Sequence, residues 1–292
     1  YGTLTPTNWR RVDADGETMF AFSLHPATPR IAYMITGGKR VDRYNTATNR
    51  VENTGNWPWV ITAGGDYAAW LQTQLNDTWL TLMLNSNHTV VSFRPGDGFQ
   101  RVTTEAGAGV SIDEPHLDRE FPVVYLSTNS AVQNKIVNLG TGTYVNPTNA
   151  GIINDDHNAP LRGKIVGISW QANAAVAVDY QGNTTVLSTR SPTDWSGDYH
   201  MAGQWVVDNP SQYFVVDQWR DTGNYPIYKG MIGFVAGNDM RLLAAHDAQG
   251  TGYDTGGQPH PTLAPDGKLV MWTSNMNNAG RFDTFLARVP VR

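Results

Sequence analysis

Histidines are the side chains in this chain whose type and spacing are best suited to chemistry. Five of the seven stand shortly before a hydrophobic, β-branched run, at intervals that recur along the chain: His25, His116, His157, His200 and His260. If these runs belong to strands that line one channel, the five imidazoles converge on one small space. An imidazole can take a proton near neutral pH and can bind a divalent metal, so this ring predicts a catalytic or metal centre.

Acidic and amide side chains accompany several of these histidines. Asp156 precedes His157, Glu114 precedes His116, and Gln258 precedes His260. Imidazole with carboxylate or amide oxygen is a suitable ligand set for Zn²⁺ or Mn²⁺. A second interpretation stays open, in which each histidine serves the repeat itself by capping a turn or bonding to a neighbouring unit.

A recurring hairpin indicates which elements would position these residues. Each copy is a strand, a turn with Gly, Asn or Asp, and a second short strand. The complete copies are residues 41–52, 90–103, 136–146, 176–187 and 232–243. Residues 284–289 read as the first strand of a sixth copy and residues 7–13 as its second, so that joining the two ends closes a ring.

Four strands in each unit of roughly 40 to 50 residues are typical of a β-propeller. Dividing 292 residues by six gives about 49 per unit, which fits that period. We therefore predict an all-β fold: a six-bladed β-propeller in one domain, residues 1–292, closed by an N-terminal strand that pairs with the last blade.

Charge and composition exclude some classes of partner. The chain has 21 basic and 26 acidic residues, with no basic run, so we expect no nucleic-acid partner. No apolar run reaches the length of a membrane span, so we expect no membrane partner. The chain starts at Tyr1 with neither an initiator Met nor a signal peptide, which suggests a processed form, and we predict a secreted or periplasmic protein.

Residues 256–289 resemble the repeat of TolB-type propellers, with a His, a Pro-Asp-Gly turn and a strand that ends in Ser-Asn. More specifically, His157, His200 and the pair Gln258 and His260 lie about one blade apart. This arrangement resembles that of oligogalacturonate lyases, which hold a divalent cation with His and Gln side chains in a propeller channel.

The resemblance implies that His200, Gln258 and His260 bind a divalent metal (Mn, Ca or Zn) and that His157 is the catalytic base. It departs from the family at two points. The family has a seventh blade, and it has a further His where this chain has Thr262. We therefore add His116 to the catalytic centre, where it could replace that ligand.

The reaction implied is β-elimination on a uronate. A base takes the C5 proton, and a cation or an arginine stabilises the negative charge that develops. Arg119 is the first candidate for this arginine. Trp57, Trp59 and Trp205 are candidates to stack on sugar rings, with packing in a blade core as the alternative.

The sequence thus predicts a secreted polysaccharide lyase that acts on an acidic polysaccharide or oligosaccharide by metal-assisted elimination. The alternative is a non-catalytic propeller that binds a glycan or a protein, or that has a structural role in an extracellular assembly. The alternative predicts neither a bound metal nor turnover.

Overall fold

The computed structural model describes residues 19–24, 30–62, 68–74, 78–84, 88–104, 110–128, 134–146, 158–161, 163–169, 172, 174–188, 201–203, 213–217, 231–236, 239–245, 261–264, 267–274 and 283–289. The chain divides into two units, residues 1–102 and 103–292. Every regular element in these ranges is a β-strand, as the recurring hairpins predict. A search of the same ranges finds no helix with the length and apolar character needed to cross a membrane.

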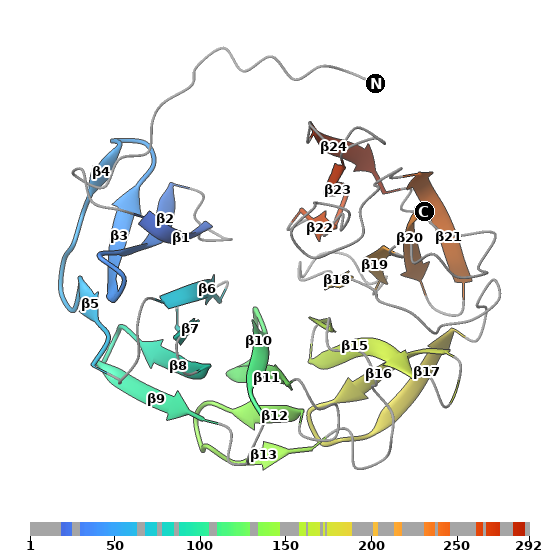
Figure 1. Cartoon of the computed structure of the whole chain (residues 1–292), viewed down its shortest axis with the longest axis horizontal. Coiled ribbons are helices and arrows are strands. Elements are labelled where there is room, and N and C mark those ends of the chain that lie inside the picture. The colour runs from blue at the N-terminus through green and yellow to red at the C-terminus, as the bar shows by residue number, and fades with distance from the viewer. Residues whose placement is uncertain are drawn as a thin grey trace. The chain divides into compact units, whose positions relative to one another are not determined.

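The first unit contains two antiparallel sheets (Figure 1). The strands of the first sheet are β1 (Met19–Leu24), β2 (Ile31–Thr36), β3 (Arg40–Asn45) and β4 (Arg50–Val51), in that order, with β5 (Trp59–Val60) also paired to β3. The strands of the second are β6 (Ala68–Thr73), β7 (Leu80–Leu84), β8 (Thr89–Arg94) and β9 (Phe99–Thr103).

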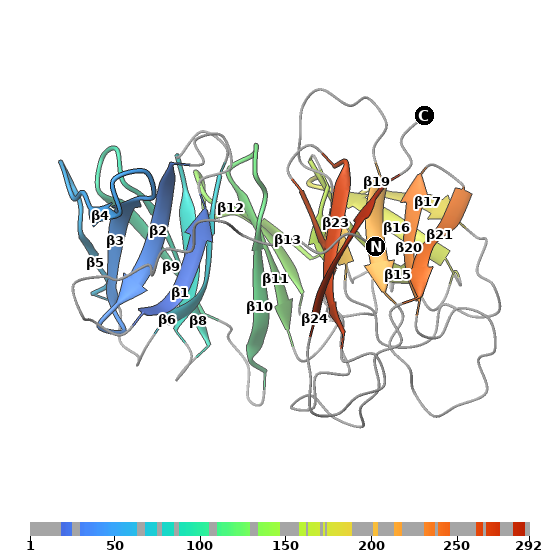
Figure 2. The ribbon, with the colours of Figure 1, turned by 90° about the horizontal axis from the view of Figure 1, so that it is seen from above.

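The second unit contains four sheets, which Figure 2 shows from a second side. The third sheet is β10 (Ile112–Leu117), β11 (Val123–Thr128), β12 (Lys135–Asn138) and β13 (Tyr144–Val145). The fourth is β14 (Ala159–Pro160), β15 (Lys164–Ser169), β16 (Ala174–Asp179) and β17 (Thr184–Ser188). The fifth is β18 (Met201–Gly203), β19 (Tyr213–Asp217), β20 (Met231–Ala236) and β21 (Asp239–Ala245), and the sixth is β22 (Thr262–Leu263), β23 (Leu269–Ser274) and β24 (Asp283–Arg288).

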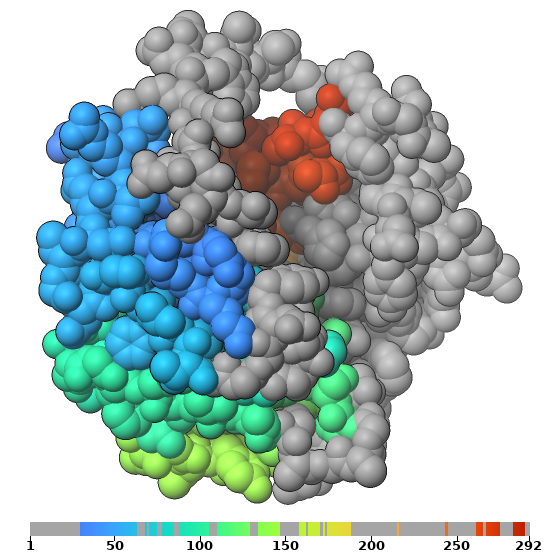
Figure 3. Space-filling view, turned by 60° about the vertical axis from the view of Figure 1, so that its left-hand side comes forward, coloured from blue at the N-terminus to red at the C-terminus, as the bar shows by residue number. Residues whose placement is uncertain are grey.

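Within each unit, successive sheets meet through their first strands. In the first unit β6 contacts β1 and β2, and in Figure 3 the blue surface of the first sheet meets the cyan and green surface of the second. In the second unit β10 contacts β14, β14 contacts β18, and β18 contacts β22. The second strands β2, β7 and β11 are buried at every residue, which explains why they read as unbroken apolar runs.

The number of blades differs from the prediction. Within the described residues, five sheets have at least four strands, whereas the sixth, β22 to β24, has three, so five complete blades are present there and not six. The missing strand was expected from residues 7–13, which lie outside the described residues, and the structure shows no closure of the ring. The five complete hairpins are confirmed, since each is the third and fourth strand of a sheet.

The recurring turn in these hairpins has a local cause. Asn45, the last residue of β3, accepts hydrogen bonds through Oδ1 from the backbone N–H groups of Ala47 and Thr48 at 2.9 and 3.3 Å. Asn138 and Asp179 do the same after β12 and β16. A short Asx side chain satisfies the turn backbone in this way, which is why Asn or Asp recurs at this point.

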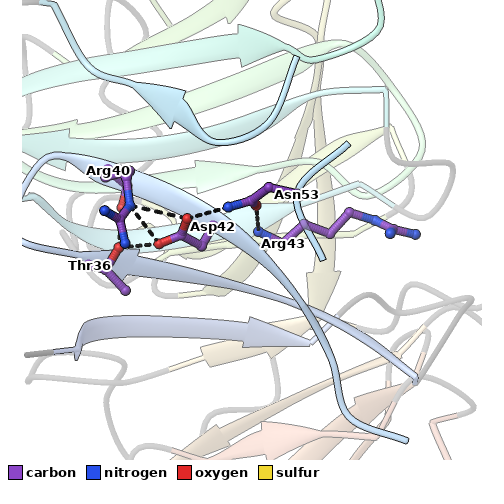
Figure 4. A network of polar contacts seen from close by, with 5 residues as sticks. All are labelled: Thr36, Arg40, Asp42, Arg43 and Asn53. Atoms are coloured by element: carbon purple, nitrogen blue, oxygen red, sulfur yellow. Dashed lines mark hydrogen bonds and ion pairs between the residues drawn. The ribbon is translucent and has the colours of Figure 1, made fainter. Parts of the chain in front are cut away.

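A buried carboxylate holds the first sheet together (Figure 4). Asp42 on β3 accepts hydrogen bonds from Arg40 Nε at 2.9 and 3.1 Å, from Asn53 Nδ2 at 2.7 Å, and from the hydroxyl of Thr36. Asn53 Oδ1 accepts the backbone N–H of Arg43 at 3.0 Å. The network joins β2, β3 and the segment that follows β4, and each partner satisfies a charge that would otherwise be costly to bury.

Candidate functional site

A histidine and a carboxylate lie side by side on the first strand of the third sheet. Glu114 and His116 are two residues apart on β10, so their side chains share one side of the strand. His116 Nε2 is 3.2 Å from Glu114 Oε2, and the two side chains are 16% and 13% exposed. Although it is buried, Nε2 makes no hydrogen bond with good geometry to any described residue.

The surroundings of this pair are aromatic and polar. The ring of His116 lies 6.2 Å from the ring of Tyr125, which faces it on β11. Tyr125 is fully buried, and its hydroxyl accepts a hydrogen bond from Asn158 Nδ2 at 3.0 Å, just ahead of β14. A link to the fourth sheet therefore fixes the wall behind His116.

Strand register relates Glu114 to three of the predicted site residues. In each sheet of the second unit, the second residue of the second strand pairs with one residue of the first strand. These first-strand partners are Leu117, Pro160, Gly203 and Leu263. Counting three residues back along the chain from each gives Glu114, His157, His200 and His260. These four residues therefore stand at the same offset along the sequence in four consecutive repeats.

His25 and His116 do not share that sequence offset, so this count does not group all five histidines together. His116 comes two residues after Glu114, and His25 follows the last residue of β1. The hydrophobic runs that the histidines precede are second strands, and the connection from the first strand varies from three residues after β14 to nine after β18. Distance from those runs therefore does not fix a position on the first strand.

The metal site falls mostly outside the described residues. His157, His200, Gln258 and His260 all lie there, so their predicted roles stay predictions. Across the ranges that the structure describes, no group of three or more His, Asp or Glu side chains could hold a metal ion. Glu114 and His116 fit such a centre in kind, since they offer a carboxylate oxygen and a ring nitrogen that no hydrogen bond occupies.

A buried carboxylate, Asp118, organises the turn that follows β10. Its Oδ1 accepts the backbone N–H groups of Glu120 and Phe121 at 2.7 and 2.9 Å. Its Oδ2 accepts the N–H of Gly163 at 3.2 Å and the hydroxyl of Tyr180. Asp118 is 2% exposed, and these bonds tie the third sheet to two turns of the fourth.

Arg119 follows Asp118 in the same turn. Burial lowers the pKa of the Arg119 guanidinium to about 10, although the charge of Asp118 acts in the opposite direction. Burial also raises the pKa of the Tyr180 phenol above its ordinary value, and the charge and hydrogen bond of Asp118 add to that rise. Asp118 thus lies between a neutral phenol from the fourth sheet and a cation in its own turn, and an approaching anion would stabilise that cation.

The predicted sugar-stacking tryptophans of the first unit pack in its core. Trp59 is 9% exposed and stacks on Phe93, with ring centroids 4.9 Å apart. Trp57 is half-buried and stacks on Tyr33 at 5.0 Å. For Trp59 the structure favours core packing over a sugar platform, and at Trp57 one ring face is covered. Trp205 lies outside the described residues.

Sequence reasoning noticed Asp118 only as a neighbour of His116, and it missed Tyr180 altogether. Their contact spans 62 positions of the chain, and neither belongs to a motif. Glu114 was noticed only as a neighbour of His116. The signal that could have found it is the register of the repeat, because His157, His200 and His260 share its position.

Comparisons with known proteins identify the fold. No family model and no curated protein matches the chain. Among solved structures, an oligogalacturonate lyase in complex with manganese matches with a TM-score of 0.65 and 14% identity, over 95% of this chain and 78% of that one. KlHsv2 with loop 6CD replaced by a Gly-Ser linker matches with a TM-score of 0.54 and 9% identity, over 89% and 75%. The dihydro-heme d1 dehydrogenase NirN matches with a TM-score of 0.52 and 11% identity, over 88% and 61%.

These similarities, with the series of four-stranded sheets, define the chain as an all-β protein of the β-propeller class. The predicted resemblance to oligogalacturonate lyase is present at the level of the fold. At 14% identity, the similarity carries the arrangement of the blades and not the reaction.

Proposed function

We propose that this propeller is a metal-assisted lyase that cleaves a uronate-containing glycan by β-elimination. The observation that supports the proposal most directly is the shared repeat position of Glu114, His157, His200 and His260. Four potential ligands or bases at one position of successive sheets, whose first strands contact one another in order, would face a common centre.

The residues of the chain would divide the chemistry as follows. His157 takes the C5 proton of the uronate, the electron pair forms a double bond between C4 and C5, and the glycosidic oxygen at C4 leaves and is protonated. His200, Gln258 and His260 would hold the divalent metal, which when bound neutralises the uronate carboxylate. Glu114 lies close enough to His116 to orient its ring, and the pair would stand at the edge of this centre.

Arg119 would supply a second positive charge for the carboxylate. Its lowered pKa reflects the cost of keeping the guanidinium away from water, and a substrate anion would recover part of that cost. The natural partner is accordingly an acidic polysaccharide or oligosaccharide, and we place the protein in a secreted or periplasmic compartment where such polymers occur.

The test is the ultraviolet absorbance of the unsaturated product, measured with pectic, alginate, ulvan and glycosaminoglycan substrates and with added Mn²⁺, Ca²⁺ or Zn²⁺. We expect the absorbance to rise with one uronate class, and EDTA should abolish that rise by removing the metal. The rate of the rise should fall below about pH 6, because a histidine that acts as the base is then protonated.

The variants His157→Ala and Glu114→Gln should lose the reaction, whereas His88→Ala, at an exposed position just before β8, should keep it. If no substrate responds and the protein carries no metal, the lyase proposal fails. The non-catalytic glycan- or protein-binding propeller would then be the better account.

A further inference from the structure

We propose a second binding site, lined by residues other than those assigned to the proposed catalytic centre, that holds one pyranose ring of a glycan. It is a partly open cavity of about 250 Å³ between turns of the third and fourth sheets, which we name the turn cavity. Its walls include the aromatic rings of Phe121, Tyr144 and Tyr180 and the polar side chains of Asn138, Thr143 and Gln181. The proposal does not depend on catalysis.

The aromatic walls offer ring surface to a ligand. Phe121 is 43% exposed and Tyr144 61% exposed, although both are large hydrophobic side chains. Phe121 meets Tyr180 edge to face, with ring centroids 6.0 Å apart and planes at 75°. Exposed aromatic rings set at an angle can cover two sides of a compact ring whose carbon-bound hydrogens face outward, as those of a pyranose do.

The polar groups suit hydroxyls better than a charged ligand. No ionisable carboxylate or ammonium lines the cavity. Asn138 uses Oδ1 for its own turn, but Nδ2 makes no hydrogen bond to a described residue. Gln181 presents an exposed side chain at the opposite turn. Lys135 Nζ lies 4.9 Å from the centre of the Tyr144 ring, so a positive charge stands beside this wall.

The cavity is held in shape before any ligand binds. Asp118 fixes two walls, because it accepts both the backbone N–H of Phe121 and the hydroxyl of Tyr180. Gly163 allows the Phe121 ring to lie close, since a Cβ at Gly163 would be only 3.3 Å from the ring. A ligand therefore does not bear the entropic cost of ordering these rings, which favours binding to a small site.

A proline-rich peptide is the other ligand that aromatic walls can hold. Such a peptide needs an extended groove for several residues in a polyproline helix. The turn cavity has the size of a single ring and amide groups to meet hydroxyls, so the structure favours a sugar unit.

The test is affinity electrophoresis in gels that contain polygalacturonate, xyloglucan, mixed-linkage β-glucan or galactomannan, with EDTA present so that the proposed metal-dependent turnover does not contribute. We expect at least one of these glycans to slow the protein. Tyr144→Ala should weaken that retardation roughly tenfold, as loss of a central aromatic contact commonly does. Tyr144→Trp should restore it.

Phe99→Ala is the matched control. Tyr144 and Phe99 are each the first residue of the fourth strand of a blade. Each ring also has a cation over it, Lys135 at Tyr144 and Arg94 at Phe99, but Phe99 does not line the turn cavity. We expect Phe99→Ala to bind as the parent protein does, and thermal unfolding of both variants checks that they fold.

Three results would overturn the proposal: no glycan retards the protein, the two alanine variants behave alike, or a proline-rich peptide binds in a Tyr144-dependent manner while glycans do not. Failure of the lyase proposal gives a different pattern, since elimination would be absent while Tyr144-dependent retardation persists.

Discussion

Replacing Asp118 by Asn should destabilise the second unit out of proportion to the size of the change. Asn keeps an oxygen that can accept the N–H groups of Glu120 and Phe121, now accepted at 2.7 and 2.9 Å. The new amide N–H₂ would stand where Oδ2 accepts the N–H of Gly163 and the Tyr180 hydroxyl. The N–H of Gly163 and the hydroxyl of Tyr180, which both donate, would then face an amide N–H₂ that also donates, in a site that is 2% exposed.

The magnitude follows from these two bonds. A hydrogen bond to a charged group contributes about 1.5–3 kcal/mol, and the Tyr180 hydroxyl can turn to accept from the new amide, which recovers part of one bond. We therefore expect Asp118→Asn to lower the free energy of unfolding by roughly 3 kcal/mol. In a protein of this size that corresponds to a Tm lower by about 6–10 °C.

Thermal unfolding followed by near-ultraviolet circular dichroism is the assay, with Tyr180→Phe and the double variant alongside. Because both residues belong to one bond, the two losses should not add, and the double variant should resemble Asp118→Asn. A Tm for Asp118→Asn within about 2 °C of the parent, or losses that add fully, would refute this account of the turn.

Three further predictions rest on the described residues. Burial lowers the pKa of Arg119 to about 10, so keeping the side chain protonated costs stability at pH 7, and that cost shrinks as the pH rises above 10. Arg119→Gln should therefore raise stability at pH 7 by up to about 3 kcal/mol in chemical denaturation while it reduces elimination, and a loss of stability would contradict this account. Gly182 has φ +90°, and an added Cβ would lie 3.0 Å from Val145, so Gly182→Ala should lower the free energy of unfolding by about 2–3 kcal/mol. Gly55→Ala is the control and should cost about 1 kcal/mol, because φ is +65° there and nothing lies within 4 Å of the added Cβ. Equal melting temperatures for the two variants would argue against the close contact at Gly182. Trp59→Ala should cost roughly 3–5 kcal/mol by urea titration, and a cost below 1 kcal/mol would mean that the indole is not part of the core.

Much of the fold could be predicted because each sheet is built from local signals. An apolar run marks the buried second strand, and an Asx residue with its turn marks the end of the third strand, as at Asn45, Asn138 and Asp179. These signals recur at a constant period, so the hairpins and the β-propeller class followed from them. The count of complete blades did not follow, because it depends on a pairing between the two ends of the chain.

The candidate site was harder to predict, because its contacts join different sheets. The five histidines looked equivalent when measured from the apolar runs, but connections of different length separate His25 and His116 from the rest. Trp57 and Trp59 looked suited to sugar binding, but stacking on Tyr33 and Phe93 places them against the core of the first unit.

The sequence by itself determined the periodic features: strands, turns, the all-β class, and histidines that recur ahead of the apolar runs. Only the structure decided that Glu114 stands at the same repeat offset as His157, His200 and His260, that Asp118 joins two sheets, and that Phe121, Tyr144 and Tyr180 line one cavity. The physical reason is the range of the interactions. Strand and turn preferences act over a few neighbouring residues, whereas a buried carboxylate finds its donors wherever packing brings them, here as far as 62 residues along the chain.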